Sequence, residues 1–127
     1  MRVNSSVYIE RPVSEVFTFI ADPANDRHWR AELTSSEAEG EVRHGLGAHI
    51  RQTVAYQGRT AGVSLEVTEF EPGRRICFRA RGGLRAHGCY DLRPDGPGTL
   101  LTVSVTLELK GDEAMLERYV RQAVGQV

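Results

Sequence analysis

The sequence is poor in the features that mark a membrane protein or a secreted, cross-linked fold. Its 127 residues include only two cysteines and one tryptophan. Its unbroken apolar runs are short, and the N-terminal string MRVNSSVYIE lacks the apolar stretch of a signal peptide. These absences argue against a membrane-spanning helix and against secretion, so we expect a cytoplasmic protein without membrane insertion.

The net charge of the chain is close to zero. Sixteen Lys and Arg stand against seventeen Asp and Glu, which leaves a net charge of −1. Such a chain has no electrostatic reason to bind nucleic acid or an anionic membrane. Its length fits one domain, residues 1–127, with a single hydrophobic core.

Motifs for metals and cofactors are also missing. His28, His44, His49 and His87 do not repeat at the spacing of metal ligands, and there is no HExxH string. The glycine-rich strings lack the strand, loop and helix context of a nucleophile elbow or a phosphate-binding loop. The sequence therefore predicts no metal and no cofactor. We expect surface histidines, except that His28 beside Trp29 could reach the mouth of a pocket.

The two cysteines, Cys77 and Cys89, have no CxxC spacing, and in a reducing cytosol two free thiols are the default. They also test the pairing of two expected strands. If Cys77 lies opposite Cys89, then Ile76 meets Tyr90. This register makes the thiols cross-strand neighbours on the face away from the aromatic side chains.

The first part of the chain predicts helical structure between two sheet segments. Residues 3–10 are rich in β-formers, and the string RPVSEVFTFIAD then places Pro12 at a helix start. The pair Asp22-Pro23 breaks this helix, and PANDRHWR can form a second short helical turn. The apolar residues at helical spacing are Val13, Val16, Phe17 and Ile20.

From about Ser35 the apolar period changes from 3.6 to two, which predicts strands. They are expected around residues 36–42, 48–57, 62–70, 75–81, 85–92 and 99–109. A two-residue turn at Gly58-Arg59 would place Val54 opposite Val63. Residues 111–127 then predict an amphipathic helix.

An antiparallel sheet with one apolar face needs a cover, and the C-terminal helix is the element long enough to supply it. We therefore expect an α+β fold. In it, a curved antiparallel sheet of about six or seven strands wraps around a long C-terminal α-helix, with two short helices after the first strand. A sheet that curls around one helix leaves a gap wherever side chains are small, and such a gap is a pocket.

Several strings in this layout resemble the START-like, or SRPBCC, superfamily, in particular its polyketide cyclase/dehydrase-like branch. They are IERPVSEVFTFIADPANDRHW at residues 9–29, GLG at 45–47, EVTEFEPGRRICFR at 66–79 and YDLRPDGPGTLLTV at 90–103. The resemblance spans nearly the whole chain, although the last helix looks short. It implies the helix-grip fold and a cavity for an apolar or amphipathic small molecule.

The resemblance also places Trp29, the aromatic after the helix break, near the cavity entrance, where an indole can stack on a ligand. The alternative is that Trp29 seals the end of the core. Strand and helix parity supplies further candidates for ligand contact. These are Gln52, Tyr56, Phe78, Tyr90, Met115 and Tyr119.

Glu69 shares the inward parity, and it is the informative exception among these residues. A carboxylate beneath a helix is costly unless it is paired, and such carboxylates serve as general acids or bases. Glu69 and Tyr90 are therefore the catalytic candidates. The alternative for Glu69 is solvation at the end of its strand.

Five arginines gather around one expected hairpin. They favour a solvated, charged edge that discourages strand-to-strand aggregation, with anion binding as the alternative. These residues are Arg74, Arg75, Arg79, Arg81 and Arg85.

Three functions remain open at this point. The first is binding or carriage of a small hydrophobic, aromatic or polyketide-like molecule. The second is a cyclase or dehydratase in which Glu69, Tyr90 or Tyr56 moves protons. The third is a protein-interaction module, and the oligomeric state, including a homodimer, is also open.

Overall fold

The computed structural model describes residues 2–29, 33–42, 45–56, 58–81 and 85–107, although not the side chains of Arg27, Trp29, Tyr56 and Arg81. Its elements in chain order are β1 (Arg2–Ile9), α1 (Val13–Ala21), the 3-10 turn η1 (Pro23–Asn25), α2 (Asp26–Trp29), β2 (Leu33–Glu39), β3 (His49–Tyr56), β4 (Arg59–Glu71), β5 (Arg75–Arg81), β6 (Ala86–Asp95) and β7 (Gly98–Leu107).

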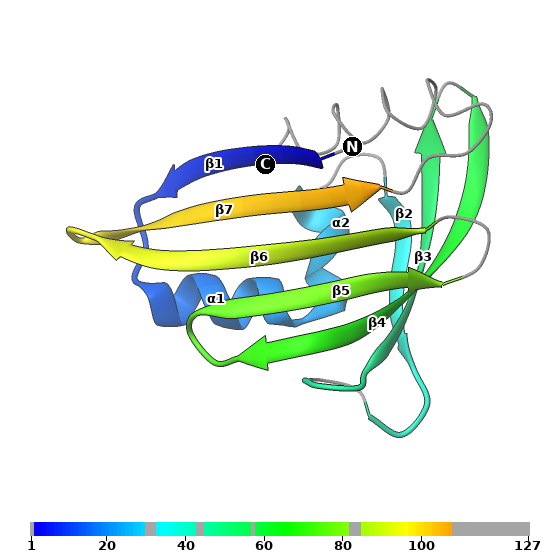
Figure 1. The fold of residues 1–127 in the computed structure, drawn as a ribbon, viewed down its shortest axis with the longest axis horizontal. Helices are drawn as coiled ribbons and strands as arrows, with labels where there is room; N and C mark the ends of the chain where they lie inside the picture. Colours follow the sequence, from blue (N-terminus) through cyan, green and yellow to red (C-terminus); the bar gives the residue numbers. More distant parts are fainter. Residues whose placement is uncertain (1, 30–32, 43–44, 57, 82–84, 108–127) are drawn as a thin grey trace.

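The strands form one antiparallel sheet in the order β1-β7-β6-β5-β4-β3-β2. The sheet is strongly curved, because β2 and β3 run steeply across the direction of β1, β7, β6 and β5 (Figure 1). The expected curved sheet is therefore present, with seven strands. The expected C-terminal helix, residues 111–127, lies outside the described residues.

One helix of nine residues, α1, lies against the concave side of the sheet (Figure 1). Pro12 precedes it directly, and Val16, Phe17 and Ile20 form its buried side. The chain then turns at Asp22, whose carboxylate accepts a hydrogen bond from the backbone N–H of Ala24. Only the turn η1 and the four-residue α2 follow in the described part of this region. Among the described helices, none has the length and apolar character needed to cross a membrane.

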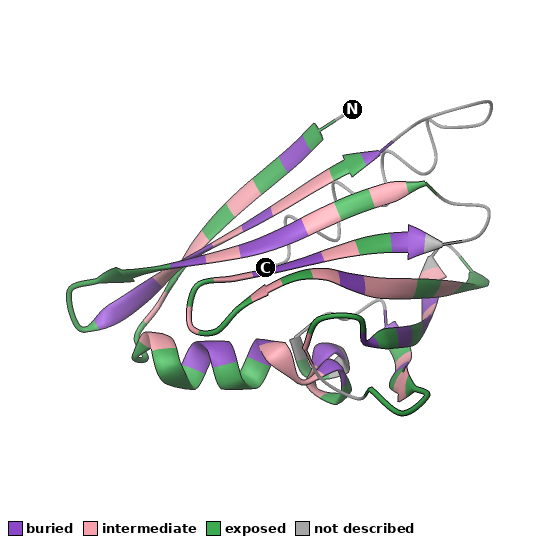
Figure 2. Cartoon of the chain, turned by 60° about the horizontal axis from the view of Figure 1, so that its bottom comes forward, coloured by how far each residue is buried: buried purple, intermediate pink, exposed green. Residues whose placement is uncertain are grey.

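The core lies between α1 and the inner face of the sheet, as the buried stripe on the helix indicates (Figure 2). On β7, Leu101, Val103 and Leu107 are buried, whereas Thr106 is exposed, so the predicted alternation is confirmed. Phe17 also packs its ring edge-on against Phe70 of β4, with the ring centroids 5.4 Å apart. The apolar faces of helix and sheet are therefore buried against each other.

The hairpin between β3 and β4 differs from the expected register by two residues. Tyr56 pairs with Arg59, so Arg59 belongs to the strand and not to the turn, and Val54 lies opposite Ala61 and not opposite Val63. Gly58 has a φ of 77°, a value that suits glycine at the second central position of a tight turn. A shift by two preserves the faces, which is why the alternation alone did not reveal the error.

The expectation that Glu69 points inward is wrong. The register of β4 and β5 shifts between Val67 and Glu69, a bulge that adds Thr68 to one strand. One extra residue exchanges the two faces for the rest of the strand. Phe70 consequently lies on the inner side, and Glu69 is exposed on the outer side opposite Cys77.

The hairpin of β5 and β6 has the predicted register, with Cys77 opposite Cys89 and Ile76 opposite Tyr90. The expectation of two free thiols is nevertheless wrong, because the two sulfurs form a disulfide. The Cα atoms of the pair are only 4.1 Å apart. In an antiparallel ladder, a separation this short is typical of a non-hydrogen-bonded pair, in which the two Cα atoms lie closer together than in a hydrogen-bonded pair.

Candidate ligand-binding site

A pocket lies between the end of α1 and the inner face of β3, β4 and β5. It contains about 290 Å³ of empty space, including the part that is open to solvent. The fully enclosed part measures only about 10 Å³, which is room for about one water molecule, so a ligand would occupy the part that is open to solvent. Its walls come from Ile20, Ala21, Pro23, Asp26, Gly45, Ala48, Ile50, Val67, Phe70, Ile76 and Phe78.

Asp26 is the charged residue in this apolar lining, and it is buried with an exposed fraction of 5%. Gln52, which is also buried, donates a hydrogen bond from Nε2 to Asp26 Oδ2 at 2.7 Å. The same nitrogen contacts Ser36 Oγ at 3.1 Å. Gln52, on β3, therefore holds the Asp26 carboxylate in place, and this hydrogen bond offsets part of the free-energy cost of burying the carboxylate.

The break after α1 explains why a carboxylate reaches this depth. Asp22 ends the helix, and η1 turns the chain so that buried Pro23 and Asp26 face the sheet. Gln52 supplies one hydrogen bond to this carboxylate. The pocket thus combines apolar walls with one buried carboxylate, and a few polar groups in an apolar lining are what orient a ligand in small-molecule sites.

The fold of this chain has counterparts among known proteins. The family model "Polyketide cyclase / dehydrase and lipid transport" matches residues 1–127. The chain belongs to this family. A search of curated proteins finds no match.

Several solved structures share the fold of this chain. A START superfamily protein from Mycobacterium smegmatis is 16% identical, with a TM-score of 0.81 over 98% of this chain and 90% of that one. A protein from Thermus thermophilus is 23% identical, with a TM-score of 0.80 over 99% and 87%. The ZhuI aromatase/cyclase from a Streptomyces species is 18% identical, with a TM-score of 0.79 over 99% and 87%. At these identities the likeness concerns the fold alone.

The structure of this family member brings together part of the set of site residues expected from the sequence. Phe78 lines the pocket. Tyr90 is buried behind it, with the two rings edge-on and their centroids 5.3 Å apart. Gln52 is buried beside the pocket as a partner of Asp26, whereas Glu69 lies on the opposite face of the sheet.

Four other residues expected to contact the ligand lie outside the described part of the structure. They are Trp29 and Tyr56, whose side chains are not described, and residues Met115 and Tyr119. Their roles as ligand contacts stay predictions. His28, two residues after Asp26, is exposed.

The sequence pattern does not single out Asp26 and Ser36 as site residues. Asp26 stands in a polar string, PANDRHWR, where nothing distinguishes it from the solvated acids around it. A signal did exist in Gln52, a polar residue at an inward position of an otherwise apolar strand face. Such a residue needs a buried partner, so its presence predicts a second polar group nearby.

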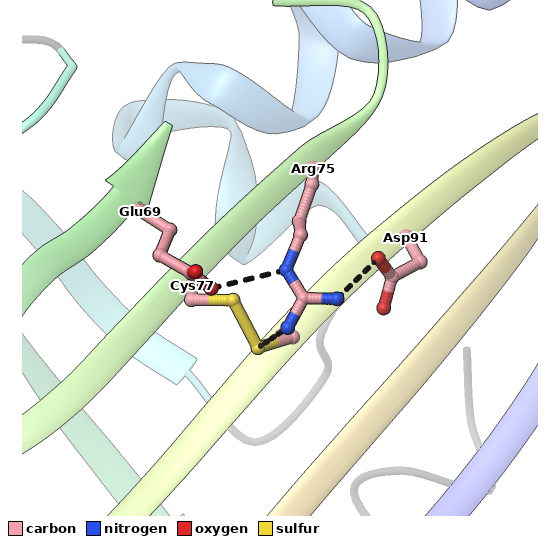
Figure 3. The surroundings of a disulfide bond; sticks show 5 residues. Glu69, Arg75, Cys77 and Asp91 are labelled. Atoms are coloured by element: carbon pink, nitrogen blue, oxygen red, sulfur yellow. Dashed lines mark hydrogen bonds and ion pairs between the residues drawn. A yellow bond between two sulfur atoms is a disulfide. The ribbon is translucent and has the colours of Figure 1, made fainter. Parts of the chain in front are cut away.

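The arginines of the β5–β6 region behave as a charged outer surface. Arg75 bridges two carboxylates, with Nε to Glu69 Oε2 at 3.0 Å and Nη1 to Asp91 Oδ1 at 2.8 Å (Figure 3). The hydrogen bond with Glu69, together with the charge of Asp91, raises the pKa of Arg75 above its ordinary value. Arg74 forms a longer pair with Glu71 at 3.6 Å. These arginines form a charged outer surface, but the expectation of a charged sheet edge is wrong, because β5 and β6 are interior strands and the edges of the sheet are β1 and β2.

Proposed function

We propose that the protein binds a small, mainly apolar molecule in the pocket between α1 and strands β3 to β5, with one polar group of the ligand directed at Asp26. The observation that carries this proposal is the buried Asp26 carboxylate in an apolar lining. Membership in the cyclase/dehydrase and lipid transport family supports ligand binding as the general role. An aromatic or polyketide-like ligand is the finer part of the proposal.

A phenol is the ligand class that we propose for this site. In the open part of the pocket its ring would contact the apolar wall that includes Phe78, and its hydroxyl would donate to Asp26. A hydrogen bond to a charged acceptor is worth about 1.5–3 kcal/mol. The site should therefore prefer phenol to benzene by about 10-fold or more.

A second function, proton transfer in a cyclase or dehydratase reaction, is favoured by the same carboxylate. A general base must lie within reach of the ligand and be held in position, and Gln52 supplies that support to Asp26. In this version Asp26 replaces Glu69 as the catalytic candidate, because Glu69 lies on the outer face. Tyr90, buried behind Phe78, is proposed as a supporting residue.

The test begins with native mass spectrometry of the protein as purified, to detect a retained small molecule. Binding of phenol and of benzene is then measured by chemical-shift titration. We expect Asp26→Asn to weaken phenol binding by about 10-fold while leaving benzene binding unchanged, since the substitution removes the charge but little volume. Asp22→Asn, four positions earlier at the helix break, is the matched control and should change neither.

A second variant tests the location of the site. Ala48 is buried in the pocket wall, so Ala48→Leu should fill the space and weaken both ligands. Ala61→Leu introduces the same side chain at an exposed position of β4 and should have no effect. Thermal melting verifies that each variant folds. Unchanged benzene binding in folded Ala48→Leu would place the ligand elsewhere.

Catalysis is separated from carriage by turnover of a retained or identified ligand. If Asp26→Asn still binds the ligand but no longer converts it, the enzymatic version is supported. If the wild-type protein binds the ligand and never converts it, carriage is supported. A cytoplasmic location and a homodimer stay predictions from the sequence.

A further inference from the structure

The outer face of β5 and β6 brings three metal-binding side chains together. His87 and Cys89 are two residues apart on β6 and so share a face, and Cys77 lies directly opposite Cys89 on β5. The ligand atoms of the three residues all lie within 4.8 Å of one another. Two cysteines and one histidine form a known donor set for Zn²⁺, with a fourth position left for water.

The disulfide determines whether these donors are available. A sulfur in a disulfide has no thiolate to offer, whereas a reduced cysteine binds Zn²⁺ as the thiolate. We propose that reduction of the Cys77–Cys89 disulfide converts this face into a site for a thiophilic divalent cation such as Zn²⁺, held by Cys77, Cys89 and His87. The site lies on the other side of the sheet from the ligand pocket and does not depend on the proposed function.

The chemistry balances with a dithiol as the reductant. The reductant donates two electrons and two protons and becomes a disulfide, while the Cys77–Cys89 S–S bond breaks to give two thiols. Binding of Zn²⁺ then releases the two thiol protons and uses the lone pair of a neutral His87 imidazole. Reoxidation by a disulfide oxidant takes two electrons from the thiolates, re-forms the S–S bond and expels the cation.

The sheet supports this exchange without a large movement. A tetrahedral zinc with Zn–S bonds of about 2.3 Å holds two sulfurs roughly 3.8 Å apart. Rotation of the two side chains can produce this separation, since the neighbouring strands hold the cysteine Cα atoms in place. Cys77 and Cys89 are buried and His87 is exposed, so the cation and its water would enter from the histidine side.

The charges around the donors suit a divalent cation. Arg79 lies opposite His87, whereas Arg75 is bridged to two carboxylates. Glu66 pairs with Arg79 in the sheet, so each of these two arginines has a carboxylate on a neighbouring strand. Reduction adds two thiolates to this balance, and Zn²⁺ compensates their charge.

Arg75 also contacts the sulfur itself. Its Nη2 donates to Cys89 Sγ at 3.3 Å, and the carboxylates of Glu69 and Asp91 hold the guanidinium over the disulfide (Figure 3). After reduction the same N–H groups can orient the Cys89 thiolate. Such outer contacts to metal ligands typically change affinity by about 10- to 100-fold.

The test uses Co²⁺ as the probe, because thiolate-to-cobalt charge transfer and tetrahedral d–d bands report the ligand set directly. Chelator-treated protein is titrated with Co²⁺ in two forms, oxidised and reduced with a phosphine. We expect the reduced form to bind one Co²⁺ with thiolate bands and to release it to Zn²⁺. The oxidised form should give no such bands.

Variants assign the ligands. His87→Ala should weaken Co²⁺ binding by about 10-fold or more while keeping the thiolate bands. Cys89→Ser removes one thiolate ligand and should lower the intensity of these bands. His49→Ala, an exposed histidine on β3, is the matched control and should leave binding unchanged. Circular dichroism establishes that each reduced variant is folded.

Three outcomes would overturn the proposal. They are the absence of thiolate bands in the folded reduced protein, equal Co²⁺ affinity in the wild type and His87→Ala, and equal binding by the oxidised form. A fourth outcome comes from counting free thiols after air oxidation. If both thiols stay free in the air-oxidised protein, the disulfide does not control metal binding and the proposal fails.

Discussion

The two faces of strands β5 and β6 differ in what holds them together. On the inner face, Ile76 and Tyr90 are paired and buried in the apolar core beneath α1. On the outer face, the disulfide joins the same two strands under a charged cluster centred on Arg75. One pair of strands thus combines packing on one side with a covalent link and ion pairs on the other.

The comparison shows where stability and chemistry should lie. Apolar burial is worth roughly 25 cal/mol per Å² and depends little on solution conditions near neutral pH, so the inner face should dominate folding. Ion pairs at a partly exposed surface contribute little, and a disulfide contributes only while it is oxidised. The outer face is therefore the side whose state can change without loss of the fold.

The largest effect is expected for the side chain that joins α1 to the inner face. Phe17→Ala removes a buried ring that packs against Phe70, and it should lower the free energy of unfolding by about 3–5 kcal/mol. Phe19→Ala, on the exposed side of the same helix, should change it by less than about 0.5 kcal/mol. Urea denaturation measures both. Equal losses of unfolding free energy for the two variants would contradict the conclusion that only one side of α1 packs against the sheet.

Reduction of the disulfide should have an intermediate effect. The cysteines are 12 residues apart, and closing a loop of this size stabilises the folded state by about 3 kcal/mol in the chain-entropy model. Urea denaturation with and without a phosphine reductant, in the presence of a chelator, measures this difference. The double variant Cys77→Ala/Cys89→Ala is the control, and its stability should not respond to the reductant.

The smallest effect is expected for the ion pairs of the outer face. Arg75 and its partners are at least one-third exposed, so Arg75→Ala should cost less than about 1 kcal/mol, and high salt should reduce the loss. Arg74→Ala removes a more exposed pair and should cost nothing measurable. A loss above about 2 kcal/mol for Arg75→Ala would show that the outer face contributes substantially to the free energy of unfolding.

The effect of pH on this cluster follows from the raised pKa of Arg75. The group is already charged in the unfolded chain at neutral pH, and folding raises its pKa further. Its contribution is fully present below the unfolded pKa and is lost only as pH rises through the still higher folded value. The Arg75 contribution to the free energy of unfolding should therefore stay constant across neutral pH.

The strands themselves could be predicted because alternation is a local property. The apolar residues of β7 recur at every second position. The register of β5 and β6 that was tested with the two cysteines, Cys77 opposite Cys89, is the one in the structure. The positions of two candidate site residues followed in the same way. Phe78 lines the pocket and Gln52 is buried beside it, as their parity indicated.

The errors arose where pairing with a neighbour overrode the local pattern. Thr68 is an extra residue in β4 only with respect to β5, so the bulge that turns Glu69 outward does not exist in the single strand. The register between β3 and β4 likewise depends on how the two strands pair. Both features change the partner of a residue and leave its sequence neighbours untouched.

The sequence by itself determined the order of elements, the apolar stripes and the family, because these depend on residue types and their spacing. Only the tertiary structure decided that Asp26 is buried beside Gln52, that Glu69 is not, and that Cys77, Cys89 and His87 converge. The physical reason is that burial and proximity are set by whichever strand or helix lies across from a residue. That neighbour is distant in the chain and is fixed by the packing of the whole sheet.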